Sequence, residues 1–459
     1  MKLSFYGGAR AVTGANYLLE FEDKHSPTGS QKILIDCGLY QGCNYCEVSN
    51  FNPFPYKPSE IERVFLTHAH IDHSGRLPKL VKDGFKGTVF STPPTKDFAQ
   101  HLLIDSQHIL ARTAAKKNKE EFMYQETDVY QLLKQWQGIE YGKEIPLGNS
   151  GAVAIFHSAG HILGSASIEI RAEGKTILFS GDLGNNPSPL IGPADAPCKA
   201  DYCLIESAYG DRIHEDLPHR QEKLKAVTVD AVKAGGALMI PAFSLERTQI
   251  LLLEMKKIFK ENAIPESVPV YLDSPLAIRL TEIYNNYRGY FKPEVASQFA
   301  HPEKIFSFPN LKMTMSTDQS RAIKGRKGPK IIIAGAGMSN AGRIIHHEKQ
   351  YLPDPHSTLL IFGYQAEGTL GRLLLDGRKK VKILGSMVPV RAKIKAIGAY
   401  SAHADQVQLL NWAAPMKKTL KKMFVVQGEE KASLALAGKM KEVYGFDAVV
   451  PQINESVEL

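Results

Sequence analysis

A chain of 459 residues is long enough for two or three domains, and its 43% hydrophobic and 23% charged residues exclude a disordered or fibrous protein. No stretch approaches the roughly 18 apolar residues of a membrane span, the apolar run at the N-terminus is too short for a secretory leader, and five cysteines make no disulfide framework. We therefore expect a cytoplasmic protein that does not enter membranes, and a net charge of +8 permits attraction to an anionic polymer without establishing it.

Short β-rich runs separated by glycine turns fill the chain up to about residue 207. Helical patterns intervene at 74–84, where a helix is expected to begin at Ser74, and across about 94–136. Most runs end in a turn with polar residues, which is typical of a layered α/β protein whose site is built from loops at strand ends. The expected strands are 2–8, 17–22, 31–38, 63–70, 87–93, 152–161, 167–174, 175–182 and 201–207.

Strands and helices then alternate regularly, which predicts a second domain with its own parallel sheet. Its expected strands include 237–243, 269–275, 329–337 and 358–364, with amphipathic helices at 219–236 and 246–262. After about residue 385, strand-like segments of the earlier kind return. We interpret this as an insertion, with predicted domains at 1–207, 208–385 and 386–459, the first and last forming one fold.

The segment THAHIDHSG at 67–75 packs three of the 15 histidines and an aspartate into six positions. His68 and His70 are two apart, so in an extended segment their imidazoles point the same way. Asp72 and His73 follow where the chain turns. Such a polar cluster is costly in a core unless a cation satisfies it, and imidazole with carboxylate suits zinc, or manganese where oxygen ligands are many.

Three more candidates occupy strand ends between small residues. They are His161 in SAGHILGS, Asp182 in ILFSGDLG and Asp36 in QKILIDCG. An isolated aspartate at such a place is usually a turn residue. Taken with the histidine cluster, the three predict a site for divalent metal.

The whole set resembles the metallo-β-lactamase superfamily, whose pattern is HxHxDH followed by a distant His and a distant Asp. The resemblance implies an αββα sandwich with a hydrolytic site for two divalent ions, zinc for preference, and a hydroxide shared between them. In that arrangement Asp36 supports the histidines from behind. The implied ligands are His68, His70 and His161 for the first ion, Asp72 and His73 for the second, and Asp182 for both.

Further motifs resemble the β-CASP branch of that superfamily, which processes nucleic acids. They are CLIESAYGDR with Glu206, GAYSAHADQ with His403, GGARAVTG, and the segments 272–277, 335–347 and 362–372. The branch includes bacterial ribonucleases and the nuclease subunit that cleaves pre-mRNA 3′ ends. The resemblance implies hydrolysis of single-stranded RNA to 5′-phosphate and 3′-hydroxyl ends, with Asp72, Glu206 and His403 as catalytic residues. His403 would give a proton to the leaving oxygen, and Glu206 would orient it.

The same motifs indicate where RNA binds. The glycine-rich segment 335–343 precedes an expected helix, and its backbone N–H groups could cradle a phosphate. We expect the substrate-binding residues to be Ser274, Gly337, Arg343, His347 and Ser401.

One position departs from the pattern. RNA-cleaving members carry a histidine before Gly-Glu in a late strand, whereas this chain has Gln427 in MFVVQGEE. An amide offers only its carbonyl oxygen, so the second ion is expected to bind weakly or to be manganese. The alternatives left open are a DNA-directed nuclease, a non-catalytic RNA-binding subunit of a processing complex, and another hydrolase on this fold; an oligomer is possible.

Overall fold

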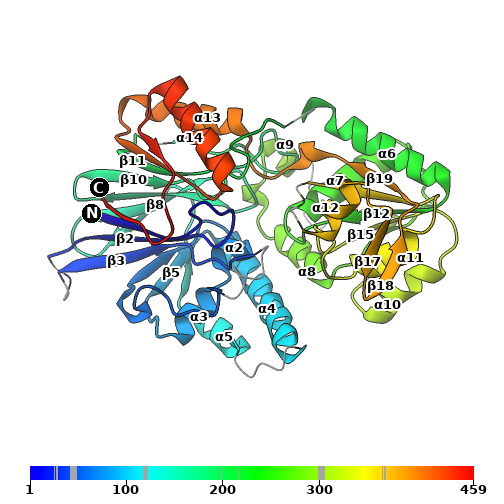
Figure 1. Ribbon diagram of the computed structural model, residues 1–459, viewed down its shortest axis with the longest axis horizontal. Coiled ribbons are helices and arrows are strands. Elements are labelled where there is room, and N and C mark those ends of the chain that lie inside the picture. The colour runs from blue at the N-terminus through cyan, green and yellow to red at the C-terminus, as the bar shows by residue number, and fades with distance from the viewer. Residues whose placement is uncertain are drawn as a thin grey trace. The chain divides into compact units, whose positions relative to one another are not determined.

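The computed structural model describes residues 1–24, 26, 29–41, 49–116, 122–197, 199–214, 217–297, 305–363, 365 and 368–459. They divide into two compact units, which are Met1–Ile213 with His403–Leu459, and His214–Ala402 (Figure 1). The first unit is discontinuous in sequence, which fits an insertion. The boundaries expected from sequence, after residues 207 and 385, lie before those that separate the two compact units.

Two seven-stranded sheets make up the first unit. In spatial order the first sheet contains β22 (Ser456–Glu458), β1 (Lys2–Gly7), β2 (Asn16–Glu22), β3 (Ser30–Ile35), β4 (Arg63–Phe65), β5 (Thr88–Ser91) and β6 (Trp136–Gly138). The second sheet contains β21 (Ala448–Val449), β20 (Lys422–Val426), β11 (Tyr202–Glu206), β10 (Lys175–Phe179), β9 (Ala166–Ala172), β8 (Ala152–Ser158) and β7 (Glu144–Leu147).

Apolar side chains of the two sheets share one core. Phe5 of the first sheet lies 5.2 Å from Phe424 of the second, between ring centroids, and both are fully buried. The opposite face of the second sheet packs against α13 (Gln406–Ala413) and α14 (Glu430–Tyr444). Its central strands are therefore covered on both faces, which explains their nearly continuous apolar sequences. The predicted αββα sandwich is confirmed.

The helices that accompany the first sheet in the described part of the chain are α2 (Ile71–Ser74), α3 (Leu77–Lys82), α4 (Pro93–Lys116) and α5 (Glu126–Lys134). The helix expected within 74–84 is present as α3, but its expected start at Ser74 was wrong, because Ser74 ends the preceding helix α2, which contains Asp72 and His73. A proline near the start of α3 suits a new first turn, so the chain breaks between the two helices. Within the described ranges, no helix combines the length and apolarity needed to cross a bilayer.

The second unit contains a six-stranded sheet in which every pairing is parallel, so the predicted parallel-sheet domain is confirmed. Its strands, in spatial order, are β14 (Leu311–Met313), β13 (Val270–Leu272), β15 (Lys330–Ala334), β12 (Ala237–Pro241), β16 (Thr358–Ile361) and β19 (Lys393–Ala396), with a hairpin of β17 (Lys380–Ile383) and β18 (Ser386–Pro389). Its helices are α6 (Arg220–Ala234), α7 (Arg247–Lys260), α8 (Pro275–Tyr284), α9 (Pro293–Ser297), α10 (Thr317–Ala322), α11 (Ile344–Tyr351) and α12 (Leu370–Leu375).

Candidate metal centre

The metal-ligand candidates of the first unit lie on loops at the carboxyl ends of its strands. In the first sheet β3 and β4 are parallel, and in the second sheet β8, β10, β11 and β20 run in one direction. Strand ends that run in one direction meet at a single edge, which brings distant loops together. Asp36 follows β3, His68 and His70 follow β4, His161 follows β8, Asp182 follows β10, Glu206 ends β11 and Gln427 follows β20.

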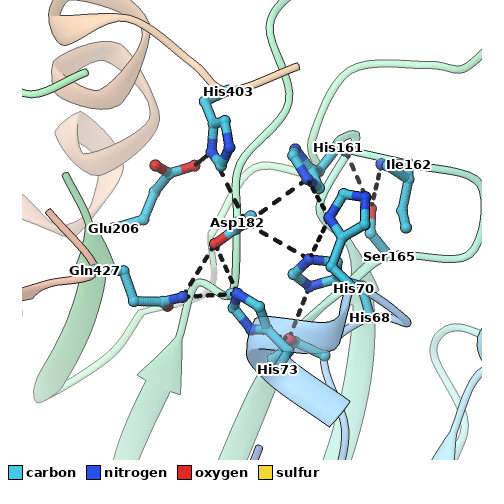
Figure 2. Close-up of polar contacts among 12 residues, drawn as sticks. His68, His70, His73, His161, Ile162, Ser165, Asp182, Glu206, His403 and Gln427 are labelled. Carbon is cyan, nitrogen blue, oxygen red and sulfur yellow. Dashed lines mark hydrogen bonds and ion pairs between the residues drawn. The ribbon is translucent and has the colours of Figure 1, made fainter. Parts of the chain in front are cut away.

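Four of these side chains converge on one point (Figure 2). The His70 Nδ1 lies 3.0 Å from the Nε2 of His68 and 3.3 Å from the Nε2 of His161. The Asp182 Oδ2 lies 3.5 Å and 3.6 Å from the same two Nε2 atoms, and all four ligand atoms fall within 4.8 Å of one another. A cation placed between these atoms could be bound by all four, and three imidazoles with one carboxylate are a donor set that fits zinc.

Ionisation within the cluster also favours a cation. Burial, followed by the neighbouring imidazole of His73, lowers the pKa of His68 well below its ordinary value of 6.5. Burial alone would raise the pKa of Asp182, but the charges of His73 and His68 outweigh it and lower that pKa. Neutral imidazole and ionised carboxylate are the forms that bind metal, so these two shifts favour metal binding by His68 and Asp182.

Asp36 orients His73 from behind. One carboxylate oxygen accepts hydrogen bonds from the backbone N–H of Thr67 at 2.8 Å, and the other accepts from the Thr67 hydroxyl at 2.8 Å and faces the Nδ1 of His73 at 2.8 Å. The Nε2 of His73 is thereby directed toward Asp182. Thr67, whose hydroxyl also lies 3.1 Å from the Nδ1 of His68, was not predicted, and its only signal is its place before the histidine cluster.

Gln427 occupies the position where a histidine was expected. Its amide nitrogen lies 2.8 Å from the Nε2 of His73 and 3.2 Å from the Oδ1 of Asp182, while that Nε2 and Oδ1 are 3.3 Å apart. Its backbone has a φ of 49° and its N–H donates to the carbonyl of Gly8. Asp72 interacts electrostatically with the same residues. Burial raises its pKa, the charge of His73 lowers it and the charge of Asp182 raises it further.

Glu206 and His403 form a pair beside the cluster (Figure 2). The Oε1 of the fully buried Glu206 accepts a hydrogen bond from the backbone N–H of Leu183 at 2.6 Å and lies 3.3 Å from the Nδ1 of His403. A backbone β-bridge to Gly184 holds His403 next to Asp182, with the Nδ1 3.8 Å from the Oδ2. Burial raises the pKa of Glu206, and the charge of His403 partly offsets this effect.

The five predicted substrate-binding residues lie in the second unit. The guanidinium of Arg343 donates to Asp273 at 2.8 Å, and the Nε2 of His347 lies 2.7 Å from the other oxygen of the same carboxylate. The hydroxyl of Ser274 accepts the N–H of Ala277 at the start of α8. Binding of substrate by these residues remains a prediction, and the same holds for Gly337 and Ser401.

Three family models match separate parts of the chain. They are the metallo-β-lactamase superfamily domain at residues 27–186, the β-CASP domain at 248–374 and the Zn-dependent metallo-hydrolase RNA specificity domain at 387–451.

Relatives extend the match over the full length. Ribonuclease TTHA0252 of Thermus thermophilus is 34% identical over 457 residues, covering 100% of both chains. Cleavage and polyadenylation specificity factor 73 of Drosophila melanogaster is 29% identical over 96% of this chain and 62% of its own. A crystal structure of a protein of unknown function from Enterococcus faecalis V583, at 12% identity and a TM-score of 0.57, covers 100% of this chain and 99% of its own and shares the fold. The resemblance seen in the motifs is confirmed, and this chain belongs to the β-CASP family of the metallo-β-lactamase superfamily.

Proposed function

We propose that this protein is a metal-dependent ribonuclease that hydrolyses phosphodiester bonds of single-stranded RNA and leaves 5′-phosphate and 3′-hydroxyl ends. The observation that carries the proposal is the convergence of three imidazoles and a carboxylate beside the Glu206–His403 pair. RNA as the substrate is supported by the match to an RNA specificity domain and by a full-length relative that is named a ribonuclease.

The ligand set in this proposal holds two divalent ions. When bound, the ions would lower the pKa of a water molecule and neutralise charge on the phosphoryl group. Zinc suits the imidazole-rich part of the set. The ligands are His68, His70 and His161 for the first ion, Asp72 and His73 for the second, and Asp182 for both.

Gln427 makes the two sites unequal. Its side chain lies against His73 and Asp182, where a third strong donor to the second ion would stand. A neutral amide contributes only a carbonyl oxygen, which is a weaker zinc donor than imidazole. The second ion is therefore bound less tightly than the first, or is manganese.

His403 supplies the proton that the leaving 3′-oxygen needs. Its Nδ1 faces the Oε1 of Glu206 at 3.3 Å, which orients the ring and stabilises its protonated form. The Nε2 is then the nitrogen that holds the transferable proton. We expect His403→Ala to lower turnover by about 100-fold or more while metal content stays that of the wild type, since general acids typically contribute that much.

The function is tested with end-labelled single-stranded RNA and DNA of one sequence, each incubated with the protein and zinc or manganese. The control is His73→Ala, which removes a proposed ligand. We expect cleavage of RNA that the control lacks, with product ends that carry a 5′-phosphate. Cleavage of DNA alone would make the protein a DNA-directed nuclease, and binding of RNA without cleavage would make it a binding subunit.

A further inference from the structure

The strand connections of the second unit diverge at one point of its sheet. The chain leaves β13 for β14 on one side, whereas it leaves β15, the neighbour of β13, for β16 on the other side. In open parallel sheets, ligands bind outside the carboxyl ends of strands where connections separate in this way. Here the ends of β12, β13 and β15 carry Phe243, Ser274 and the turn 335–337.

Phe243 is an exposed aromatic residue that is held in place. Its side chain is 40% exposed, and its carbonyl accepts the hydroxyl of Thr248 at 2.8 Å. Its ring packs on Gly337, where a Cβ would lie 2.5 Å from the ring, and the carbonyl of Gly337 accepts the amide of Gln365 at 3.0 Å. The absence of a side chain at Gly337 thus lets the ring of Phe243 pack directly on the backbone of the turn, which leaves part of its aromatic surface exposed.

Two hydroxyl groups lie near the turn on which this ring packs. The hydroxyls of Ser244 and Ser274 lie 3.8 Å and 3.7 Å from the place of a Cβ on Gly335, in the turn that also carries Gly337. The carboxylate of Asp273, the residue before Ser274, pairs with the guanidinium of Arg343. An aromatic face beside neutral hydroxyls matches a nucleobase, which has a flat face and a hydrogen-bonding edge, better than it matches a phosphate or an apolar peptide.

We propose that Phe243 is a stacking platform for one unpaired nucleobase of the bound RNA, with the Ser244 and Ser274 hydroxyls beside it to meet polar groups on the base edge. The inference rests on the proposed function and deepens it, because it names a residue that binds a base and not the scissile phosphate. Stacking on an aromatic ring tolerates every base, so the platform adds affinity without fixing a sequence.

The test measures KM and kcat of the zinc-loaded enzyme on a single-stranded RNA and on copies that each lack one base. We expect Phe243→Ala to raise KM about tenfold or more, since stacking of one base on an aromatic residue is worth that much. The KM of the wild type should rise by a similar factor when the base at one position is missing. The KM of Phe243→Ala should be the same with and without that base. Phe51→Ala is the matched control, because Phe51 is 38% exposed and lies in the other unit.

Phe243→Leu separates stacking from packing, because leucine covers Gly337 but has no aromatic face. Thermal melting of each variant shows whether the fold is kept. The platform would be overturned if Phe243→Leu had the KM of the wild type. It would also be overturned if, at every position, the effects of base loss and of Phe243→Ala on KM were additive. RNA cleavage itself would stand in both cases. A wild type that cleaves no RNA would overturn the proposed function first, and the platform with it.

Discussion

The two units place polar side chains at the same kind of location, the carboxyl ends of strands, yet with opposite results. In the first unit the ring nitrogens of His68, His70 and His161 face one another and the carboxylate of Asp182, all within 4.8 Å. A cation between these atoms could be bound by all four of them. This edge of the first unit is therefore a candidate metal site.

In the second unit a buried carboxylate is balanced by partners from the same unit. The fully buried carboxylate of Asp273 accepts hydrogen bonds from Thr314, Ser320 and Arg343 and faces the Nε2 of His347. These contacts hold the pKa of Asp273 well below its ordinary value against burial, which would raise it. A polar residue at a strand end is thus weak evidence for function by itself, and what distinguishes the candidate metal site is the number of metal-binding atoms that converge there.

Asp182→Ala is the strongest test of this difference between the two units. If the first unit depends on an external cation, loss of the carboxylate shared by both proposed ions should lower RNA cleavage roughly 1,000-fold or more. Metal content, measured by mass spectrometry after dialysis, should fall together with activity. Asp447→Ala, at a 62% exposed side chain of the same unit, should keep both. An Asp182→Ala enzyme with full metal content and turnover would show that the cluster is not the metal centre.

Asp273→Ala makes the complementary test in the second unit. It leaves the charge of Arg343 without its buried partner, so the free energy of unfolding should fall by about 3–5 kcal/mol, as for other broken buried ion pairs. Urea denaturation measures this loss, and the metal content of the folded protein should not change. Asp318→Ala, at a 94% exposed side chain, should cost less than about 0.5 kcal/mol. A metal-depleted but stable Asp273→Ala protein would contradict the division of roles.

Much of the fold was accessible from sequence because its evidence is local. The alternation of apolar runs with glycine turns marks the strands, and the spacing of His68, His70 and His73 marks the start of the centre. The pairing of Asp273 with Arg343, 70 positions later, was not predictable, because only the fold brings these residues together. The guanidinium of Arg343 contacts Asp273 within its own unit, and its binding of substrate remains a prediction.

Glu348 gives a further test of how the second unit treats a buried carboxyl group, because this group is held in its neutral, protonated form. It is fully buried, the Ser339 hydroxyl donates to its Oε1, and burial raises its pKa from 4.5 to about 8. As pH rises from about 4.5, the unfolded chain loses this proton first, so stability is lost progressively until about pH 8. The glutamate should cost the wild type about 5 kcal/mol over that interval.

Denaturation of Glu348→Gln between pH 5 and pH 8.5 measures this cost. The variant has no titrating group at position 348, so its free energy of unfolding should exceed that of the wild type by an amount that grows with pH. Glu282→Gln, at an exposed position of the same unit, should run parallel to the wild type. Parallel curves for Glu348→Gln as well would mean that Glu348 is ionised in the folded state.

Gln427→His tests whether the amide of Gln427 weakens the binding of the second metal ion in the first unit. Gln427 has a φ of 49°, a backbone region in which histidine is more readily accommodated than most residues, so the substitution should preserve the fold. An imidazole beside His73 and Asp182 adds a strong zinc donor, so the weaker of two zinc affinities should rise by about tenfold, equal to about 1.4 kcal/mol. Calorimetric titration of the metal-free protein resolves the two steps. Gln427→Ala should leave the weaker step no tighter than in the wild type, whereas two equal, tight steps already in the wild type would mean that the amide does not limit the second ion.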